Sequence, residues 1–480
     1  MGNNWQVDTF IVGSASSSTT LTDEDGLYPS HTNELRQRSD DMKSMLDNYI
    51  YVDQYAGDDL GAKINAARAD NSDSFSNSIV VLPSGAQTLT TSANFTDSVH
   101  FTVAGLGTTI NMAVVGGVGL DFAGSNGYKI EIAEISGDYD DITAVAIFCA
   151  SSSTGTNGDL GVINVTNCHG KFSSALVYHI GGEELRIINT QLVNESVIGY
   201  SYAQTADNVD SISSAYVTEV ARSVSQARII NSFIASNGFA ETALIYTDRG
   251  QLYFDNVEFR SEGETIIKVN CSANGVENLH FHSIRMRMAS SLTNDACNFI
   301  EADDDSNGYS LRYVLIDGES FIQTQRTLTT GCLIKTLGTC GVYGISIENR
   351  GGVIQAGGGL TVAGDAEFVY LDTITAIGVT VAGNLATCYY NNGYQNPLLA
   401  TALLTVSGTT SNLTLGYPGG YSANMLGLIE KNSDPTDPPE GQSVMWQSDG
   451  TGAGDDGDIM IKITAGAVTK TATIVDFSGA

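Results

Sequence analysis

The stretch Arg186-Ile187-Ile188-Asn189 recurs as Arg228-Ile229-Ile230-Asn231 and, with aromatic residues, as Tyr253-Phe254-Asp255-Asn256. We align Leu279-His280-Phe281-His282 with them as a fourth copy. Alternate side chains of a strand point to one face, so every second residue is expected to point inward and stack on its counterpart in the next copy. Strand-like runs begin near Tyr128, Leu160, Leu185, Ala227, Gln251, Val276, Ser310, Val342 and Ile377. Their irregular spacing of roughly 25 to 40 residues predicts a solenoid of stacked coils.

A second strand is expected in each coil, because another apolar pattern recurs between the first copies. Its members are Ala175–Tyr178, Ala243–Tyr246, Thr265–Lys268, Asn298–Glu301, Cys332–Lys335 and Phe368–Leu371. Helical periodicity is almost absent between these runs, so the chain is predicted to be all-β over this region.

Composition limits the classes of partner. The chain has 480 residues with 52 Gly and 7 Pro, which is typical of many turns between short strands. Its net charge of -32 repels nucleic acid and anionic membranes, so we expect neither as a partner. The 7 cysteines form no Cys-x-x-Cys pair, which argues against a disulfide framework or a zinc site. Several lie in apolar runs and are expected to be buried thiols of a protein that folds in a reducing cytoplasm.

Residues 1–50 are predicted to form a separate leader and helical neck. The N-terminus shows neither a basic segment nor a long apolar run, so we expect no signal peptide and no membrane insertion. Residues 1–30 are rich in Ser and Thr, with Trp5 and Phe10 as their large side chains. Such segments often become ordered only when they dock to a partner. Residues 31–49 carry a partial apolar stripe and are expected to be helical.

A short helix is predicted after Asp58 and Asp59, either of which can cap it. It ends near Ala66-Ala67, and a strand and turn follow at Ser78–Gly85. The apolar residues that share one face of this helix are Leu60, Ile64 and Ala67.

This helix and the Ile79–Gly85 strand together resemble the beginning of the pectate-lyase-like right-handed parallel β-helix of bacteriophage tailspikes. The resemblance covers about residues 54–90, with the repeats behind it as support. It implies a β-helix over residues 51–397 whose N-terminal end is capped by the helix. It also implies a homotrimeric receptor-binding protein, made in the host cytoplasm and mounted on the virion tail. Residues 1–50 would bind virion baseplate or tail proteins, and the β-helix would bind host surface polysaccharide.

Residues 398–480 are expected to form one or more small strand-rich units, with a linker at 431–441 that contains the Pro cluster. A unit of three strands is marginal by itself, so packing between subunits would stabilise it.

The segment Leu279–Met288 is the first candidate for function. Alternation places Leu279, Phe281, Ile284, Met286 and Met288 inside. The outward residues are His280, His282, Arg285 and Arg287, and the preceding coil adds Tyr253, Asp255, Glu258 and Arg260.

Two interpretations of this row remain open. In the first, it is a polysaccharide groove, with Asp255 and Glu258 as catalytic acids. The residues expected to bind substrate are His280, His282, Arg285, Arg287, Arg260 and Tyr253. Such a groove would cleave a glycosidic bond by hydrolysis, or a uronate by β-elimination. In the second interpretation, Glu258 and Arg260 pair with Arg285 and nearby acids as a structural salt-bridge ladder.

Metal binding is the other chemistry that the sequence raises. The acidic run containing Asp303, Asp305 and Asn307 matches the first half of an EF-hand loop, so it is a candidate for calcium or simply a solvated turn. His280 and His282 point to one face and are a candidate metal pair. No other cofactor is required.

Three functional classes follow. The first is a tailspike or tail fibre that binds host polysaccharide and depolymerises it in many relatives. The second is a free polysaccharide lyase, hydrolase or epimerase on the same fold. The third is a non-catalytic β-helical adhesin or structural appendage.

Overall fold

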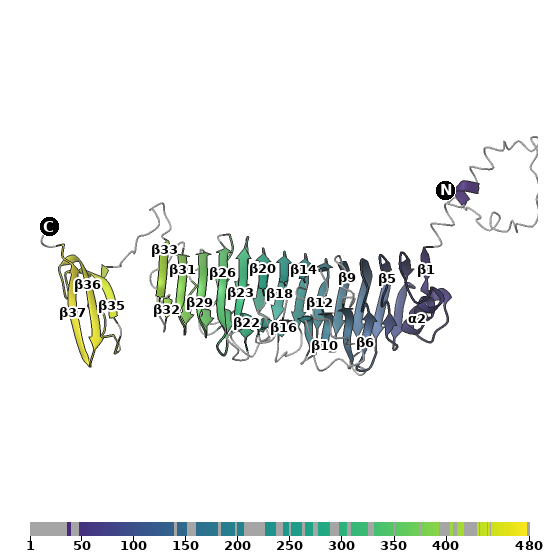
Figure 1. Cartoon of the computed structure of the whole chain (residues 1–480), viewed down its shortest axis with the longest axis horizontal. Helices are drawn as coiled ribbons and strands as arrows, with labels where there is room; N and C mark the ends of the chain where they lie inside the picture. Colours follow the sequence, from purple (N-terminus) through teal and green to yellow (C-terminus); the bar gives the residue numbers. More distant parts are fainter. Residues whose placement is uncertain are drawn as a thin grey trace, which may run out of the picture. The chain divides into compact units, whose positions relative to one another are not determined.

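The computed structural model describes the following residues: 36–39, 48–138, 142–150, 160–180, 184–196, 199–205, 226–236, 243–248, 251–261, 265–271, 277–288, 297–304, 309–324, 331–349, 351–373, 377–392, 404–406, 410–416, 430–431, 433–438, 440–441 and 443–477. Two units can be distinguished by their internal contacts. The first contains Met1–Asn270 with Arg285–Asn294, and the second contains Cys271–Ile284 with Asp295–Ala480. Each unit contains stacked coils of parallel strands, so the expected all-β parallel β-helix is confirmed (Figure 1).

The first unit has two parallel sheets, and the chain alternates between them. Its first sheet contains β1 (Tyr49–Tyr51), β2 (Ile79–Val81), β3 (Gly85–Leu89), β5 (Thr102–Met112), β7 (Tyr128–Gly137), β9 (Leu160–Gly170), β11 (Glu184–Ile188), β12 (Gln191–Asn194), β14 (Gln226–Ile230), β15 (Phe233–Ser236), β17 (Gln251–Asp255), β18 (Glu258–Ser261) and β21 (Arg285–Met288). Its second sheet contains β4 (Ala93–Asn94), β6 (Val118–Asp121), β8 (Thr143–Ala150), β10 (Phe172–Ile180), β13 (Tyr200–Thr205), β16 (Ala243–Thr247) and β19 (Thr265–Asn270). The long strand β9 pairs with both β11 and β12, so the first sheet continues from there as two ladders.

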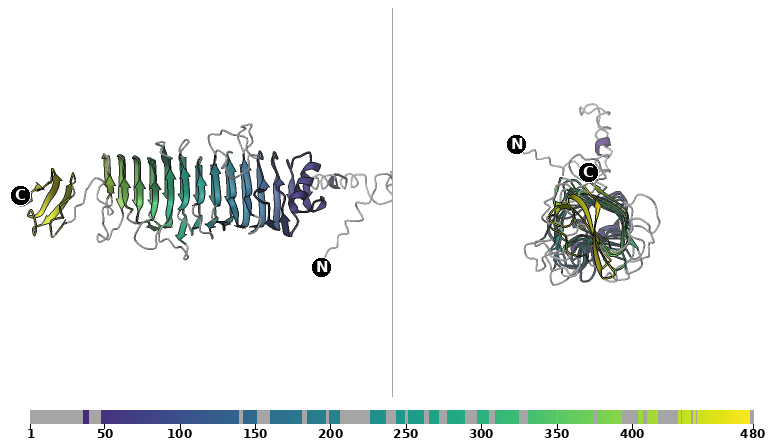
Figure 2. Two further views of the ribbon diagram at one scale, coloured as in Figure 1. Left: turned by 90° about the horizontal axis from the view of Figure 1, so that it is seen from below. Right: turned by 90° about the vertical axis from the view of Figure 1, so that its left-hand side faces the viewer.

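The second unit repeats this plan. One sheet contains β20 (Glu277–His282), β23 (Ser310–Asp317), β24 (Phe321–Gln323), β26 (Gly341–Asn349), β27 (Ile354–Gln355), β29 (Ala366–Thr373), β31 (Leu385–Asn392) and β33 (Thr410–Gly416). The other contains β22 (Asn298–Asp303), β25 (Cys332–Thr336), β28 (Gly359–Val362), β30 (Val379–Val381) and β32 (Leu404–Val406). The side view in Figure 2 shows the strands as successive parallel rungs.

Two details of this unit differ from the sequence alignment. Phe368–Leu371 lies in β29, which belongs to the sheet of first strands rather than second strands. Both ladders also continue past residue 397, because β32 pairs with β30 and β33 pairs with β31.

The C-terminal residues form a separate four-stranded sheet. It contains β34 (Glu430–Lys431), β35 (Ser443–Asp449), β36 (Asp456–Ala465) and β37 (Val468–Val475). The last three strands pair antiparallel, as expected for a small meander.

The core forms where apolar residues stack in register. Ile187 lies opposite Ile229, which lies opposite Phe254 in the next coil, and all three are buried. Burial of each such side chain stabilises the fold by about 1.5–3 kcal/mol. All seven cysteines are buried free thiols, and burial is the environment predicted for several of them. Desolvation raises the pKa of Cys149 and Cys297 to about 12, so these thiols stay protonated near neutral pH.

Three successive coils of the first sheet bend at one residue in the left-handed region. Asn189, Asn231 and Asn256 occupy this bend with φ of 52°, 49° and 51°. Asparagine tolerates this conformation better than most residues because its short side chain makes local hydrogen bonds. The Asn256 amide donates to Asn231 Oδ1 at 2.8 Å, so the side chains also link adjacent coils.

The fourth copy in the sequence alignment is shifted by one residue. The left-handed bend falls on Ser283, with φ of 50°, and not on His282. His280 and His282 therefore occupy the within-coil positions of Tyr253 and Asp255. The predicted alternation still holds, because Leu279, Phe281, Ile284 and Met286 are buried.

The helix α2 (Leu60–Asp70) covers one end of the first unit (Figure 1). Asp59 is its N-cap, as predicted, and accepts from the Ala62 amide at 2.6 Å. The other carboxylate oxygen accepts from the amides of Thr90 and Thr91, each at 2.6 Å. One side chain thus caps the helix and holds it to the chain after β3. The expected buried face is confirmed by Leu60, Ile64 and Ala67.

Of the helix predicted over residues 31–49, the structure describes residues 36–39, which are helical, and residues 48 and 49, where Tyr49 begins β1 instead of continuing the helix. A 3-10 turn, η3 (Val52–Gln54), precedes α2. Within the described residues, no helix combines the length and the apolar character needed to span a membrane.

Candidate functional site

A surface groove of about 410 Å³ lies along the bends of the first unit. The asparagines of three successive bends lie along it, together with Gln191 and Phe233. Glu258 and Arg285 also line it, and they occupy register-matched positions on β18 and β21. The groove is therefore lined by amides, one carboxylate, one guanidinium and one aromatic ring.

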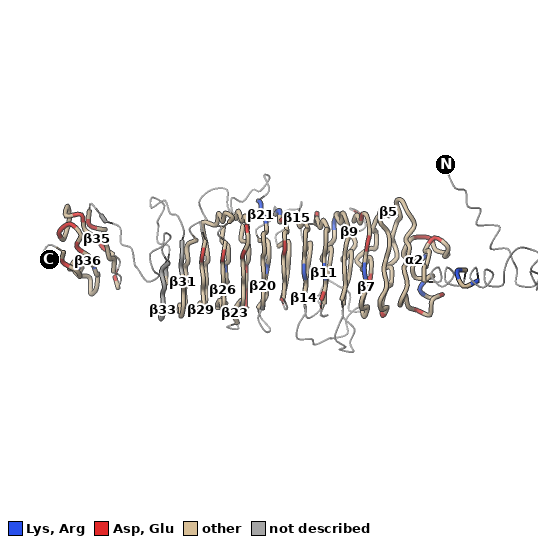
Figure 3. The backbone as a smooth tube through the Cα atoms, turned by 90° about the horizontal axis from the view of Figure 1, so that it is seen from above, with Lys and Arg blue, Asp and Glu red and all other residues tan. Residues whose placement is uncertain are grey.

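The structural salt-bridge ladder is not present in the form considered above. Glu258 lies opposite Arg285 and Arg260 lies opposite Arg287. Within the described ranges, none of these four residues makes an ion pair with another residue. Arg260, Arg285 and Arg287 are exposed on adjacent strands, and a basic position is visible at β21 in Figure 3. These guanidinium groups are available to solvent or to a ligand.

The other two predicted residues of this coil have different surroundings. Tyr253 has the Arg228 guanidinium 5.3 Å from its ring centroid, and its hydroxyl donates to Gln251 at 2.8 Å. Arg228 also lies 3.1 Å from Glu184, whose pKa is lowered mainly by its hydrogen bond from Arg186. Tyr253 thus belongs to a surface charge network. Figure 3 shows both acidic and basic residues along these coils.

Asp255 is exposed at the end of β17, and Glu258 begins β18 on the other side of the Asn256 bend. Of these two acids, Glu258 lines the groove and Asp255 does not. Their role as a catalytic pair stays a prediction.

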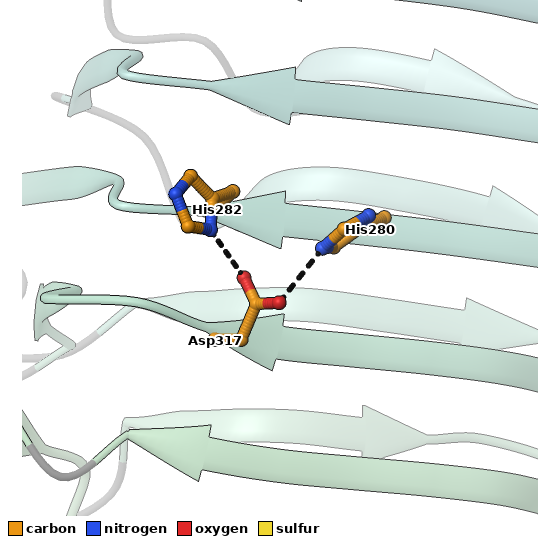
Figure 4. A group of neighbouring side chains, drawn as sticks. All are labelled: His280, His282 and Asp317. Atoms are coloured by element: carbon orange, nitrogen blue, oxygen red, sulfur yellow. Dashed lines mark hydrogen bonds and ion pairs between the residues drawn. The ribbon is translucent and has the colours of Figure 1, made fainter.

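A second cluster lies on the second unit (Figure 4). His280 Nε2 is 3.1 Å from Asp317 Oδ2, and His282 Nδ1 is 2.8 Å from Asp317 Oδ1. The strands dictate this arrangement. His282 pairs in register with Asp317 on β23, and His280 lies two residues away on the same face of β20. Each carboxylate oxygen therefore faces a different imidazole.

Aromatic side chains gather on the same sheet of this unit. The ring centroids of Tyr313 and Tyr343 are 5.5 Å apart, and those of Tyr343 and Phe368 are 5.2 Å apart, both edge to face. Tyr313 is 45% exposed and Phe368 is 48% exposed. We refer to these three residues as the aromatic cluster. Tyr370, on the same strand as Phe368, stacks at 4.6 Å on Tyr389, its register partner on β31.

Both exposed rings of the aromatic cluster stand on strained backbone. Tyr313 has φ of 53° and Phe368 has φ of 55°, a conformation that is rare for bulky residues. Register places them in one row with Asn278 and Gly344, whose φ values are 64° and 71°. A Cβ on Gly344 would lie 2.9 Å from the Tyr313 ring, so this glycine leaves the space that the ring occupies.

Three acidic side chains, one on each of β23, β26 and β29, lie in a single row across the same sheet. Glu348 pairs in register with Asp372, and Asp317 occupies the corresponding position on β23. Glu348 is exposed and accepts from the Ser346 hydroxyl at 2.8 Å, whereas Asp372 is buried. These carboxylates come from different coils.

The calcium prediction is only partly covered by the described residues. Asp303 is half-buried at the end of β22, and Asp305 and Asn307 lie outside the described ranges. The intervening Asp304 is buried and accepts from the Thr339 hydroxyl at 2.8 Å. At least one acid of the run therefore has a structural role in joining coils, and calcium binding stays a prediction.

The sequence reasoning did not find Asp317 or the aromatic cluster. A signal was present, because two consecutive outward residues interrupt the alternation in three successive coils. The interrupted stretches are Leu311–Val314, Val342–Ile345 and Ala366–Val369.

Comparison with protein-family models and with curated proteins gave no match for this chain.

Proposed function

We propose that this protein binds a polysaccharide through its β-helix, as a receptor-binding protein of the phage tailspike kind. The observation that carries the proposal is the aromatic cluster. Burial of a large aromatic ring contributes more favourable free energy than burial of a smaller side chain. Two half-exposed rings in one cluster therefore point to a ligand that covers them. Left-handed backbone costs a bulky residue roughly 1–2 kcal/mol, and strain of this kind is usually retained at functional sites.

The surroundings of the cluster suit a sugar. Flat rings stack on the apolar faces of pyranoses, and the nearby Ser346 offers a hydroxyl that can hydrogen-bond to those of a sugar. A chain with a net charge of -32 is a poor partner for nucleic acid, which is the other polymer that stacks on aromatic rings. Arg285 in the groove of the first unit would bind carboxylate or hydroxyl groups of the same class of polymer.

The tailspike part of the proposal rests on the resemblance at residues 54–90 and on the parallel β-helix. On this proposal the protein is a homotrimer on the virion tail, docks to baseplate or tail proteins through residues 1–50 and binds the surface polysaccharide of the host. Light scattering of the purified full chain tests the assembly. A trimer supports the proposal, and a monomer favours a free polysaccharide-processing enzyme.

Cleavage of the polysaccharide is a second candidate function, and the row of carboxylates favours it. Neighbouring parallel strands lie about 4.8 Å apart, close to the carboxylate separation of about 5–5.5 Å in retaining glycosidases. The in-register pair Glu348 and Asp372 combines an exposed acid with a buried one. Glu348→Gln should abolish release of reducing ends and leave polysaccharide binding intact. If cleavage survives, this pair is not catalytic.

The binding test uses a panel of bacterial surface polysaccharides and the full-length chain. Replacing Tyr313 and Phe368 together by Ala should lower affinity at least tenfold. The matched control is Tyr49→Ser with Tyr51→Ser, because those rings are also exposed (40% and 38%) and neighbouring, but lie on β1 of the first unit. Equal losses in both double variants, or no loss in the first, would refute the assignment. A Glu258→Gln/Arg285→Gln variant tests the groove in the same assay.

A further inference from the structure

We infer that His280, His282 and Asp317 bind a divalent transition-metal ion of the zinc class. The three residues offer two imidazole nitrogens and one carboxylate oxygen, and these ligand atoms all lie within 4.8 Å of one another. This inference does not depend on the proposed function.

The choice of metal follows from the donor atoms. Imidazole nitrogen is a good ligand for zinc, nickel, cobalt and iron, whereas calcium and magnesium prefer sites made of oxygen. Two histidines and one carboxylate are the protein ligands of several catalytic zinc sites, in which a water completes the coordination. The set carries one negative charge with both imidazoles neutral, so a dication is strongly attracted to it. The nearby acids of the same row increase that attraction.

The distances agree with this assignment. Ligand atoms that bind a tetrahedral ion at about 2.0–2.1 Å lie roughly 3.3 Å from one another. Each imidazole nitrogen faces its own carboxylate oxygen of Asp317, at 3.1 and 2.8 Å, and both distances are close to that value. One ligand atom from each residue lies within 4.8 Å of the other two, so a small shift of the side chains would bring them to this spacing. The two ring planes are inclined at 72°, so the imidazoles do not stack.

The side chains can make this movement, and the backbone holds them in place. The His280 side chain is 34% exposed and that of His282 is 50% exposed, so neither ring is fixed by packing on all sides. Both strands end at this point in left-handed bends, at Ser283 and Gly318. The Ser320 hydroxyl accepts from the Ile284 amide at 3.2 Å and donates to the Asp317 carbonyl at 2.9 Å. These bonds fix the relative position of the two bends and hence of the ligands.

A second histidine–carboxylate pair, His169 with Glu134, offers a comparison with only one imidazole. His169 Nε2 lies 3.1 Å from Glu134 Oε1 in the first unit. The remaining oxygen of Glu134 accepts from the Thr109 hydroxyl at 3.2 Å, where Asp317 has its second histidine. The Glu134 pair is therefore a matched control, with one imidazole in place of two.

The test is titration of the untagged, EDTA-treated full chain with Co²⁺, followed by visible absorption and then by displacement with Zn²⁺. Millimolar Mg²⁺ in the buffer occupies weak acidic sites. We expect one Co²⁺ per chain. His280→Ala, His282→Ala and Asp317→Asn should each weaken binding at least tenfold, whereas His169→Ala should leave it unchanged.

His282→Gln separates ligation from structure, because its amide can still donate to Asp317 but does not replace an imidazole ligand. It should retain the far-UV circular dichroism and thermal midpoint of the unchanged chain and lose Co²⁺ binding. Absence of stoichiometric Co²⁺ binding, binding unaffected by the three variants, or an equal loss in His169→Ala would overturn the inference. Polysaccharide binding measured with and without EDTA is a separate readout, so the two proposals can fail independently.

Discussion

At the strained position of Tyr313, we predict that a glycine variant is more stable than an alanine variant, which is the reverse of the usual order in a strand. Tyr313→Ala and Tyr313→Gly both remove the ring and its contact with Tyr343, so they differ by a single methyl group. In an ordinary strand, glycine is less favourable than alanine by roughly 0.5–1 kcal/mol because it loses more freedom on folding. At φ of 53° alanine carries a steric cost of about 1–2 kcal/mol that glycine does not. The glycine variant should therefore be more stable by about 0.5–1 kcal/mol.

Hydrogen exchange measured by mass spectrometry on peptides from β23 detects this difference locally. A tenfold change in an equilibrium corresponds to about 1.4 kcal/mol, so the amides of β23 should exchange about threefold more slowly in Tyr313→Gly than in Tyr313→Ala. Tyr370 on β29 supplies the control, because it is a half-buried tyrosine of the same sheet without a positive φ. At this position the usual preference applies, so the amides of β29 should exchange more slowly in Tyr370→Ala than in Tyr370→Gly.

If Tyr313→Gly exchanges as fast as Tyr313→Ala or faster, the backbone at this position is not strained and the argument for a retained functional ring fails. If the prediction holds, stability and binding should respond in opposite directions. Relative to Tyr313→Ala, the glycine variant would regain stability without regaining affinity for the polysaccharide.

Three further predictions concern single side chains. Burial raises the pKa of Asp121 to about 6, and nearby Asp97 adds to the rise. The folded state thus binds more protons than the unfolded one between about pH 4 and 6, and stability should fall as pH rises through that window. Thermal midpoints should show Asp121→Asn more stable than the unchanged chain at pH 8 and equal to it at pH 4; a constant gap would contradict this. Burial opposes ionisation of Asp59, but hydrogen bonds from Thr90, Ala62 and Thr91 outweigh it and lower its pKa. The stability that the Asp59 carboxylate contributes is therefore present above its unperturbed pKa of 3.8 and is lost as the pH falls below that value. Asp59→Ala should lower stability by about 1–2 kcal/mol. It should also remove the increase in hydrogen exchange of the α2 amides at low pH, whereas Asp59→Glu should partly keep that increase. A Cβ on Gly318 would lie 2.5 Å from Ser283 Oγ and 3.1 Å from His282 Cε1, so Gly318→Ala should weaken Co²⁺ binding. Gly378→Ala, with nothing within 4 Å, should not; equal effects of the two glycine variants on Co²⁺ affinity would exclude this explanation.

Most of the fold could be predicted from the sequence because a β-helix repeats its own pattern. Buried residues such as Ile187 and Ile229 recur at matching positions, and the Asp59 cap is a local signal that needs only a few neighbouring residues. The alignment of Leu279–His282 was wrong by one residue because serine, rather than asparagine, occupies the left-handed bend. The assignment of Phe368 was wrong because a left-handed residue interrupts the alternation that the argument assumed.

The candidate sites were harder to predict because their members come from different coils. His280 and Asp317 are far apart in sequence, and the length of the connection between two coils varies. No periodicity indicates which acid will lie opposite a given histidine. The two histidines were identifiable as neighbours on one face, whereas their carboxylate partner required the register of β20 and β23.

The unequal connections between strands have a consequence for how this protein can change. Residues 248–250 suffice to join β16 to β17, whereas residues 206–225 separate β13 from β14 in the same unit. Because strand register is fixed by stacking on adjacent coils, the scaffold accommodates inserted segments of different length without altering its core. Segments of different length or sequence can thus be gained, exchanged or engineered at these junctions while the supporting coils remain unchanged.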